Sequence, residues 1–109
     1  MTDLDNVAEA YARGNVRFMG LDLIVERGAL VPRAETELLG RTALEIIFAT
    51  RLSVPRVIDM CCGAGNLACA IAHYAPHSRV WASDLTDDCV QVARRNVELQ
   101  NLSGRVDVV

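Results

Sequence analysis

The residues whose types and spacing point most directly to chemistry lie in the stretch VIDMCCGAGNLACAIA, from Val57 to Ala72. An apolar run passes through Asp59 and reaches two glycines, Gly63 and Gly65, which flank one small residue, and a helical pattern follows at once. Glycine removes the side chain that would keep a ligand from the backbone, and it permits unusual dihedral angles. The free amides at the start of a helix can bind a ligand in the same space. The stretch therefore predicts a ligand-binding loop, although two glycines could also serve the close packing of a helix on a strand.

A second acidic residue, Asp84, ends the next apolar run, 19 residues after Gly65. In a sheet of parallel strands, ligands bind beyond the carboxyl ends of the strands, where an acidic residue can accept hydrogen bonds from ribose hydroxyls. The alternative role of Asp84 is to cap the helix that begins near Thr86. Together, the glycine pair and the strand-end aspartate predict a cofactor that contains a nucleoside.

The charge of Asp59 separates two classes of nucleoside cofactor. The run from Gly63 to Ala68 satisfies the G-x-G-x-x-G/A pattern of dinucleotide-binding loops, which would indicate a nicotinamide-dependent oxidoreductase. An ionised carboxylate four residues before Gly63 would repel the pyrophosphate of a dinucleotide, whereas it would attract a cationic amine or sulfonium. S-adenosylmethionine carries both of these cations and no phosphate. We therefore expect S-adenosylmethionine as the cofactor and keep the oxidoreductase as the alternative from another enzyme class.

Strands and helices alternate through the second half of the chain. The patterns predict a buried strand over Arg56–Cys61, a helix over Asn66–Tyr74, a strand over Arg79–Ser83, a helix over Thr86–Leu99 and a strand over Arg105–Val109. An order of strand, helix, strand, helix, strand is half of a doubly wound parallel sheet. The predicted fold class is therefore α/β, namely the N-terminal half of a Rossmann-like doubly wound parallel sheet.

A helix and a β-hairpin are predicted before this sheet. The helix covers Asp3–Gly14, and two short strands joined by a turn lie within Val16–Arg33, where apolar and polar residues alternate. Pro32 is expected to end the second strand, because proline cannot donate a ladder hydrogen bond.

A longer helix, from Ala34 to about Arg51, connects the hairpin to the first strand of the sheet. Its apolar face is predicted from residues that recur at helical spacing: Leu39, Ala43, Ile46, Ile47 and Thr50. These patterns divide the chain into a lead-in with a hairpin, residues 1–33, and a partial cofactor-binding domain, residues 34–109.

Composition and charge limit the classes of protein that fit the sequence. The 109 residues are 51% hydrophobic and carry a formal net charge of −3, which indicates an ordered globular domain with no overall attraction for nucleic acid. The N-terminus lacks the basic and apolar regions of a signal peptide, and no apolar run is long enough to span a membrane. We expect a cytoplasmic protein with no membrane partner. The four cysteines show no zinc-ligand spacing, so we expect reduced, buried thiols and no metal site.

Three stretches resemble known methyltransferases. VIDMCCGAGNLACAIA and VWASDLTDDCVQVARRN are similar to the first two motifs of the class I S-adenosylmethionine-dependent methyltransferases. FMGLDLIVERGALVPRAETELL, from Phe18 to Leu39, resembles the segment before the cofactor domain of the HemK-like family. Those enzymes modify a glutamine side-chain amide in translation release factors and in a ribosomal protein. The usual Pro-Arg-Pro-x-Thr-Glu of that family is Pro-Arg-Ala-Glu-Thr-Glu here, over Pro32–Glu37.

The resemblance implies a class I methyltransferase fold and a role for individual residues. Six residues would bind the cofactor: Asp59, Cys61, Gly63, Gly65, Asp84 and Leu85. Asp59 would lie near the methionine end, Asp84 would bind the ribose hydroxyls, and Leu85 would lie against the adenine. The Pro32–Glu37 segment would lie near the methyl-transfer pocket. Cys61 departs from the glycine that is commoner at its position.

The resemblance also implies an acceptor for the parent enzyme. A protein glutamine, as in a release factor, is the expected acceptor, and the amino groups of rRNA or DNA bases are the alternative. The Asn-Pro-Pro-Tyr motif with which the family binds the substrate amide does not occur in the 109 residues. We therefore name no catalytic residue, and we expect the chain alone to be inactive or nearly so. A further alternative is a non-catalytic module that keeps the cofactor fold.

The family's strand order implies a free edge. The first strand of the sheet, Arg56–Cys61, normally pairs with a fourth strand that the 109 residues do not include. Because an unpaired apolar edge is a template for another strand, we expect the chain to self-associate.

Overall fold

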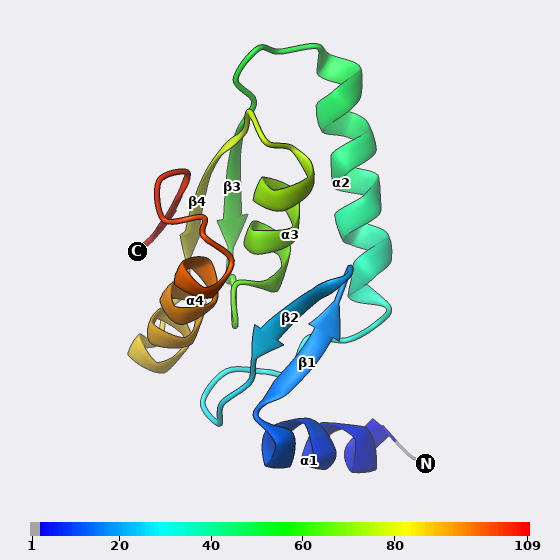
Figure 1. The fold of residues 1–109 in the computed structure, drawn as a ribbon, viewed down its shortest axis with the longest axis vertical. Helices are drawn as coiled ribbons and strands as arrows, with labels where there is room; N and C mark the ends of the chain where they lie inside the picture. Colours follow the sequence, from blue (N-terminus) through cyan, green and yellow to red (C-terminus); the bar gives the residue numbers. More distant parts are fainter. Residues whose placement is uncertain (1–2) are drawn as a thin grey trace.

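The computed structural model describes residues 3–109, and its elements alternate as the sequence patterns predict (Figure 1). In chain order they are α1 (Asp3–Arg13), β1 (Asn15–Phe18), β2 (Leu21–Ile24), α2 (Thr36–Thr50), β3 (Arg56–Met60), α3 (Asn66–Tyr74), β4 (Arg79–Ser83), α4 (Asp87–Leu99) and β5 (Val106–Val108). The predicted order of helices and strands is confirmed. Within residues 3–109, no helix has the length and hydropathy needed to cross a membrane.

The last three strands form a parallel sheet in the order β3-β4-β5. Ile58 lies opposite Trp81, and Trp81 lies opposite Asp107 in the next strand. Because α3 and α4 carry the chain back to the start of each following strand, the carboxyl ends of β3 and β4 lie side by side at one end of the sheet (Figure 1). The predicted half of a doubly wound α/β sheet is therefore confirmed, with β3 as an edge strand.

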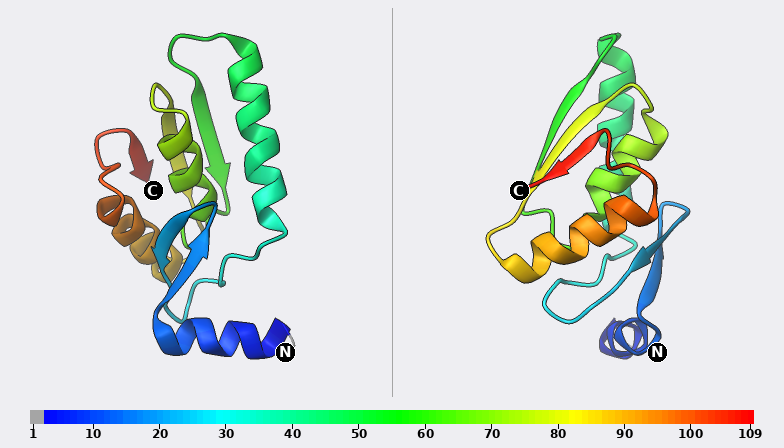
Figure 2. Two further views of the ribbon diagram at one scale, coloured as in Figure 1. Left: turned by 45° about the vertical axis from the view of Figure 1, so that its right-hand side comes forward. Right: turned by 60° about the vertical axis from the view of Figure 1, so that its left-hand side comes forward.

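One face of this sheet carries the hydrophobic core. The helices α2, α3 and α4 lie on that side (Figure 2), and Val80 and Ala82 of β4 are fully buried beneath them. Phe18 and Leu23 of the hairpin belong to the same core cluster as these residues and Ala93 of α4. The hairpin and the sheet thus share one core, and the division of the chain at residue 33 stays a prediction.

The other face of the sheet is open to solvent. Ile58 and Met60 of β3 are 69% and 70% exposed, although both are large and apolar. Trp81 of β4 is partly covered by the guanidinium of Arg79, whose central carbon lies 5.5 Å from the ring centroid. The prediction of a buried first strand is therefore wrong for this face, because all the covering helices lie on the opposite side of the sheet.

The hairpin is fixed at its tip by side chains from two helices. β1 and β2 pair in antiparallel fashion around a turn at Met19. The backbone N–H of Met19 donates to the Glu37 carboxylate of α2 at 2.6 Å. The hydroxyl of Tyr74, at the end of α3, donates to the Met19 carbonyl. These contacts hold the hairpin against both helices.

The second hairpin strand is shorter than its sequence pattern predicts. β2 ends at Ile24, and not at Pro32, because no strand is available to pair with the residues that follow. Val25 makes one more backbone hydrogen bond, to the Gly14 carbonyl at 3.0 Å. The chain then turns at Gly28, where φ is +106° and a side chain would collide with Asp88 of α4. The alternating pattern here belongs to a loop.

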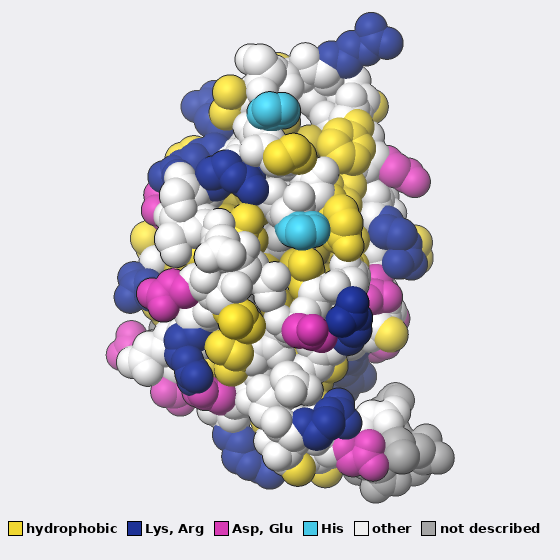
Figure 3. Space-filling model, in the orientation of Figure 1, with side chains coloured by type: hydrophobic (Ala, Val, Ile, Leu, Met, Phe, Trp, Pro, Cys, Tyr) yellow, Lys and Arg dark blue, Asp and Glu magenta, His cyan; other side chains and the backbone are white. Residues whose placement is uncertain are grey.

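The buried face of α2 also differs from the predicted one. Gly40 and Leu44 are buried, whereas Leu39 and Ile46 are exposed. The prediction is confirmed for Ala43 and Ile47, which pack against the core, and it is wrong for Leu39 and Ile46. The sulfur of Met19 in the hairpin occupies the space where a side chain at Gly40 would lie, so the hairpin and α2 approach each other closely at this glycine. Hydrophobic side chains accordingly reach the surface over α2 and α3, beside both histidines (Figure 3).

Candidate functional site

A tight loop joins β3 to α3 at the carboxyl ends of the strands. The N–H of Cys62 continues the sheet ladder to the Ser83 carbonyl at 2.8 Å, and the N–H of Gly65 closes a turn on the Cys62 carbonyl at 2.8 Å. Cys61, Gly63 and Gly65 have φ values of +57°, +55° and +80°. A loop with three left-handed residues explains why glycine suits these positions. Cys61 adopts the same conformation at a steric cost.

The two glycines of the loop meet different surroundings. A Cβ atom added at Gly65 would lie 3.0 Å from the Cβ of Ala93 in α4. A Cβ atom added at Gly63 would meet nothing within 4 Å. Gly65 therefore serves the close packing of the loop against α4, and Gly63 leaves open space beside its backbone. Close packing of helix on loop thus explains Gly65, and the prediction of space for a ligand fits Gly63.

Asp84 ties the end of β4 to this loop. One carboxylate oxygen accepts from the Gly63 N–H at 2.9 Å, and the other accepts from the Thr86 N–H at 3.3 Å. The hydrogen bond from Gly63 lowers the pKa of Asp84 most, so the carboxyl group is held in its ionised form. The cap of α4 is instead Thr86, whose hydroxyl accepts from the Cys89 N–H at 3.2 Å. Because Thr86 is the cap of α4, the carboxylate of Asp84 is available to hold the Gly63 N–H in the loop.

Asp59 places a second carboxylate beneath the same loop. It is half-buried, and it accepts one hydrogen bond, from the Ala68 N–H in the first turn of α3 at 3.2 Å. Burial raises the pKa of Asp59, and the nearby charge of Asp84 adds to the increase. Among the described residues, neither carboxylate forms an ion pair with an arginine. The loop therefore carries uncompensated negative charge, which favours a cationic ligand.

All six predicted cofactor residues lie at the carboxyl ends of β3 and β4 or in the loops that follow. Leu85, next to Asp84, is 98% exposed, so an apolar side chain stands in solvent beside the strand-end carboxylate. A planar apolar group could rest against it. The structure thus brings together the charges, the open backbone and the apolar surface that a nucleoside with a cationic tail requires. The binding roles of these residues stay predictions.

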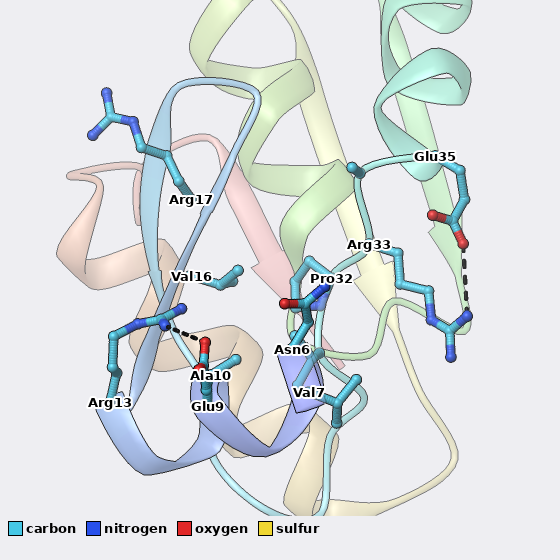
Figure 4. A pocket seen from close by; sticks show the side chains of 12 residues that line it. Asn6, Val7, Glu9, Ala10, Arg13, Val16, Arg17, Pro32, Arg33 and Glu35 are labelled. Carbon is cyan, nitrogen blue, oxygen red and sulfur yellow. Dashed lines mark ion pairs between the residues drawn. The ribbon is translucent and has the colours of Figure 1, made fainter. Parts of the chain in front are cut away.

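The Pro32–Glu37 segment borders a cavity of about 310 Å³, which is also lined by residues of α1 and β1 (Figure 4). Pro32 and Arg33 line the cavity, and the Arg33 guanidinium pairs with the Glu35 carboxylate at 3.6 Å. None of the six cofactor residues lines it. The proximity of this segment to a methyl-transfer pocket stays a prediction.

The four cysteines are free thiols with different environments. Cys61 is exposed, which corrects the prediction of four buried thiols, because the loop turns its side chain outward. Burial raises the pKa of Cys62 and of Cys69 to about 12. Cys89 is also buried. Across the part of the chain that the structure describes, no three His, Cys, Asp or Glu side chains could hold a metal ion.

Sequence reasoning missed one residue of the site, Asn96 of α4. Its side chain is fully buried and donates a hydrogen bond to the Ala64 carbonyl inside the loop at 2.8 Å. The signal was present in the sequence, because Asn96 shares a helical face with the apolar residues Val92 and Ala93. An amide at such a position must find partners in the core.

The second half of the chain and most of α2 before it match a known protein family. Residues 40–109 match the family described as the methyltransferase small domain. The chain belongs to this family. The match excludes the oxidoreductase alternative, which rested on the glycine pattern alone.

Two proteins similar to this chain are glutamine methyltransferases. The chain is 38% identical to the release factor glutamine methyltransferase of Clostridium acetobutylicum, over 90% of this chain and 34% of that protein. It is 34% identical to the ribosomal protein uL3 glutamine methyltransferase of Xylella fastidiosa, over 96% of this chain and 33% of that protein. The chain thus spans about a third of the length of these relatives.

The fold agrees with that of a solved methyltransferase. The N-terminal domain of human METTL16, in complex with SAH, superposes with a TM-score of 0.67 and 24% identity, covering 84% of this chain and 36% of that chain. The predicted class I methyltransferase fold is confirmed.

Proposed function

We propose that the chain binds S-adenosylmethionine at the Cys61–Gly65 loop and is the cofactor-binding part of a methyltransferase that modifies a glutamine side-chain amide. The observation that carries the proposal is the hydrogen bond between the Gly63 N–H and Asp84, beside the unpaired carboxylate of Asp59. The glutamine methyltransferases at 34% and 38% identity support the acceptor.

Each side chain of the loop has a chemical task in this proposal. Asp84 would accept hydrogen bonds from the ribose hydroxyls with the lone pairs that Gly63 and Thr86 leave unused. The negative charge of Asp59 would attract the amine of the methionine end. Leu85 would pack against the adenine ring. The open side of Gly63 would let the cofactor approach the backbone.

The bound cofactor would supply a methyl group on a sulfonium. The acceptor nitrogen forms a bond to the methyl carbon, the carbon–sulfur bond breaks, and the nitrogen loses a proton while S-adenosylhomocysteine is released. The protein contributes mainly by holding donor and acceptor in line. Without the Asn-Pro-Pro-Tyr motif, we expect the 109 residues to bind the cofactor with at most a trace of turnover.

The exposed thiol of Cys61 gives a direct test of cofactor binding at this loop. Iodoacetamide should modify Cys61 first, because Cys62 and Cys69 are buried and have pKa values near 12. Saturating S-adenosylhomocysteine should slow the labelling of Cys61, measured by peptide mass spectrometry. Nicotinamide adenine dinucleotide is the control and should give no protection. Equal labelling with and without S-adenosylhomocysteine would count against the proposed site.

The acceptor can be tested with S-adenosylmethionine labelled in the methyl group. Any label that the chain transfers should appear on a release factor or on protein uL3, and none on rRNA. The net charge of −3 gives the chain no general attraction for the phosphate backbone. Label on rRNA would show that the acceptor is a nucleic-acid base and not a protein. Rapid turnover would show that methyl transfer does not require the Asn-Pro-Pro-Tyr motif.

We also infer that two copies associate along the free edge of β3. The edge exposes unpaired backbone groups, and Ile58 and Met60 extend the apolar surface beside it. Light scattering should give more than the monomer mass of 11.9 kDa. The substitution Ile58→Lys should restore a monomer that stays folded, because the side chain is exposed in the single chain. A monomer in the unsubstituted chain at high concentration would contradict this inference.

A further inference from the structure

Asn96, near the end of α4, buries an uncharged amide completely in the core. Taking an amide out of water is unfavourable unless each of its polar atoms finds a partner. No buried side-chain polar atom lacks a hydrogen bond in the described part of the chain, so this amide is fully satisfied. Its partners show what the amide holds in place.

The partners of Asn96 come from two segments far apart in the sequence. Its Oδ1 accepts from the Ile24 N–H at 2.6 Å, and its Nδ2 donates to the Ile24 carbonyl at 3.1 Å. The same Nδ2 donates to the Ala64 carbonyl at 2.8 Å. The amide thus pairs with the last residue of β2 as another strand would, and its remaining proton reaches into the Cys61–Gly65 loop.

Gln100, the C-cap residue of α4 and one turn beyond Asn96, repeats half of this arrangement. Its Nε2 donates to the Asp22 carbonyl of β2 at 2.7 Å. Four residues of helix rise by about 6 Å and two residues of strand by about 6.7 Å, so two amides on one helical face can match alternate residues of β2. Gln100 therefore contacts the hairpin alone, whereas Asn96 contacts the hairpin and the loop.

The carbonyl that Asn96 holds lies between the two glycines of the loop. The adjacent peptide leads into Gly65 and the first turn of α3, and on the other side Gly63 is fixed by Asp84 at 2.9 Å. The two glycines leave the backbone of the loop free to adopt other dihedral angles. Besides the ladder bond from the Cys62 N–H to the Ser83 carbonyl and the packing of Gly65 on Ala93, two side chains therefore fix its geometry from outside: the carboxylate of Asp84 and the amide of Asn96.

We propose that Asn96 is a positioning residue for the cofactor, which locks the Cys61–Gly65 loop and the docked hairpin into one arrangement. Through this one amide, the geometry of the loop is linked to a hairpin that lies about 40 residues earlier in the sequence. The inference rests on the proposed function, since it assumes that the loop binds S-adenosylmethionine.

Three substitutions at the C-terminal end of α4, one of them at its cap, separate positioning from stability. Asn96→Ala removes the contacts to both hairpin and loop, Gln100→Ala removes a contact to the hairpin alone, and Val97→Ala opens a gap in the core on the next residue. For each variant, calorimetry gives the Kd for S-adenosylhomocysteine, and thermal unfolding gives the melting temperature. All titrations are made at a temperature at which the variant is folded.

Asn96→Ala should weaken binding at least tenfold. Gln100→Ala and Val97→Ala should leave the Kd within twofold, even where Val97→Ala lowers the melting temperature as much as Asn96→Ala does. Equal Kd values for Asn96→Ala and the unsubstituted chain would overturn the positioning role and leave the proposed function intact. No binding by the unsubstituted chain would overturn the proposed function and this inference with it.

Amide hydrogen exchange in the unsubstituted chain tests the same inference if Asn96→Ala does not fold. Saturating S-adenosylhomocysteine should slow exchange of the Ile24 N–H, which is bonded to Asn96, together with the loop amides. The Met19 N–H at the hairpin tip is bonded to Glu37 and serves as the internal control, with little change expected. Protection of the loop amides without protection of Ile24 would contradict a link through Asn96.

Discussion

The two halves of the Cys61–Gly65 loop have different surroundings. The first half is open at Cys61, which is exposed, and at Gly63, where a side chain would meet no atom within 4 Å, although Cys62 between them is buried. The second half is packed: Ala64 is buried, and Gly65 lies against Ala93 of α4. Gly65 thus serves helix packing, whereas Gly63 leaves the space that we propose for a ligand.

Gly63 and Gly65 belong to one motif but have different roles in the structure. The packed half belongs to the fold, because its removal would disturb α3 and α4 whether or not a ligand binds. The open half has no packing reason for glycine: the left-handed φ of +55° favours glycine at position 63, and the open space beside it fits the ligand that we propose. Substitutions in the two halves should therefore change different measured quantities.

Gly65→Ala should give the largest effect, on stability. The new methyl group would lie 3.0 Å from the Ala93 Cβ, in a residue whose φ is +80°. The left-handed conformation and overpacking together should cost about 3 kcal/mol of the free energy of unfolding. Urea denaturation measures this change. A loss below about 1 kcal/mol, as for an ordinary surface change, would show that the second half is not tightly packed.

Gly63→Ala should act on affinity more than on stability. Its φ of +55° should cost about 1 kcal/mol, but the added methyl group meets no protein atom and projects into the proposed ligand space. We expect the Kd for S-adenosylhomocysteine to rise at least tenfold, measured by calorimetry on the folded variant. If Gly63→Ala binds like the unsubstituted chain, the open half has another purpose.

The pH dependence of binding should follow Asp59. The pKa of Asp59 is raised above its ordinary value of 3.8 by burial, and that of Asp84 is lowered, so Asp59 is protonated first as the pH falls. Affinity for the amine of S-adenosylhomocysteine should therefore decrease on acidification before Asp84 titrates. The free fold gains stability from this protonation, because the folded chain binds the proton more tightly than the unfolded chain.

The matched control for this pH dependence is Asp59→Asn. It should bind more weakly near neutral pH, and its affinity should change less on acidification. A pH profile identical to that of the unsubstituted chain would remove Asp59 from the site.

Cys61→Gly should give the smallest effect, a gain in stability. Relief of the left-handed conformation at φ +57° outweighs the greater flexibility of glycine in the unfolded chain, with a net gain of about 0.5 kcal/mol. Thermal unfolding against the matched variant Cys61→Ala, which keeps the steric cost, isolates the backbone contribution. A lower melting temperature for Cys61→Gly than for Cys61→Ala would contradict it.

The sequence predicted the sheet and the loop because their signals are local. The apolar runs around Asp59 and Asp84, and the glycines between them, are each readable within a few residues. Contacts between distant segments were not readable in this way. The close approach of Met19 to Gly40 joins the hairpin to α2, and the bridge from Asn96 spans 72 residues to Ile24. Such features follow from the packing of whole elements.

The open face of β3 shows the same limit. Ile58 and Met60 lie in a run of apolar amino acids that predicts core residues, and only the arrangement of the helices shows that no element of residues 3–109 covers them. A sequence pattern reports the preference of a side chain for burial. The topology decides whether burial is available within the chain.

The most direct test of the central claim is a calorimetric titration of the chain with S-adenosylhomocysteine, with nicotinamide adenine dinucleotide as the parallel ligand. We predict saturable binding of S-adenosylhomocysteine alone, weakened more than tenfold by Asp84→Ala, which removes the hydrogen-bond acceptor of Gly63. Binding of the dinucleotide alone, or S-adenosylhomocysteine affinity unchanged in Asp84→Ala, would contradict the account.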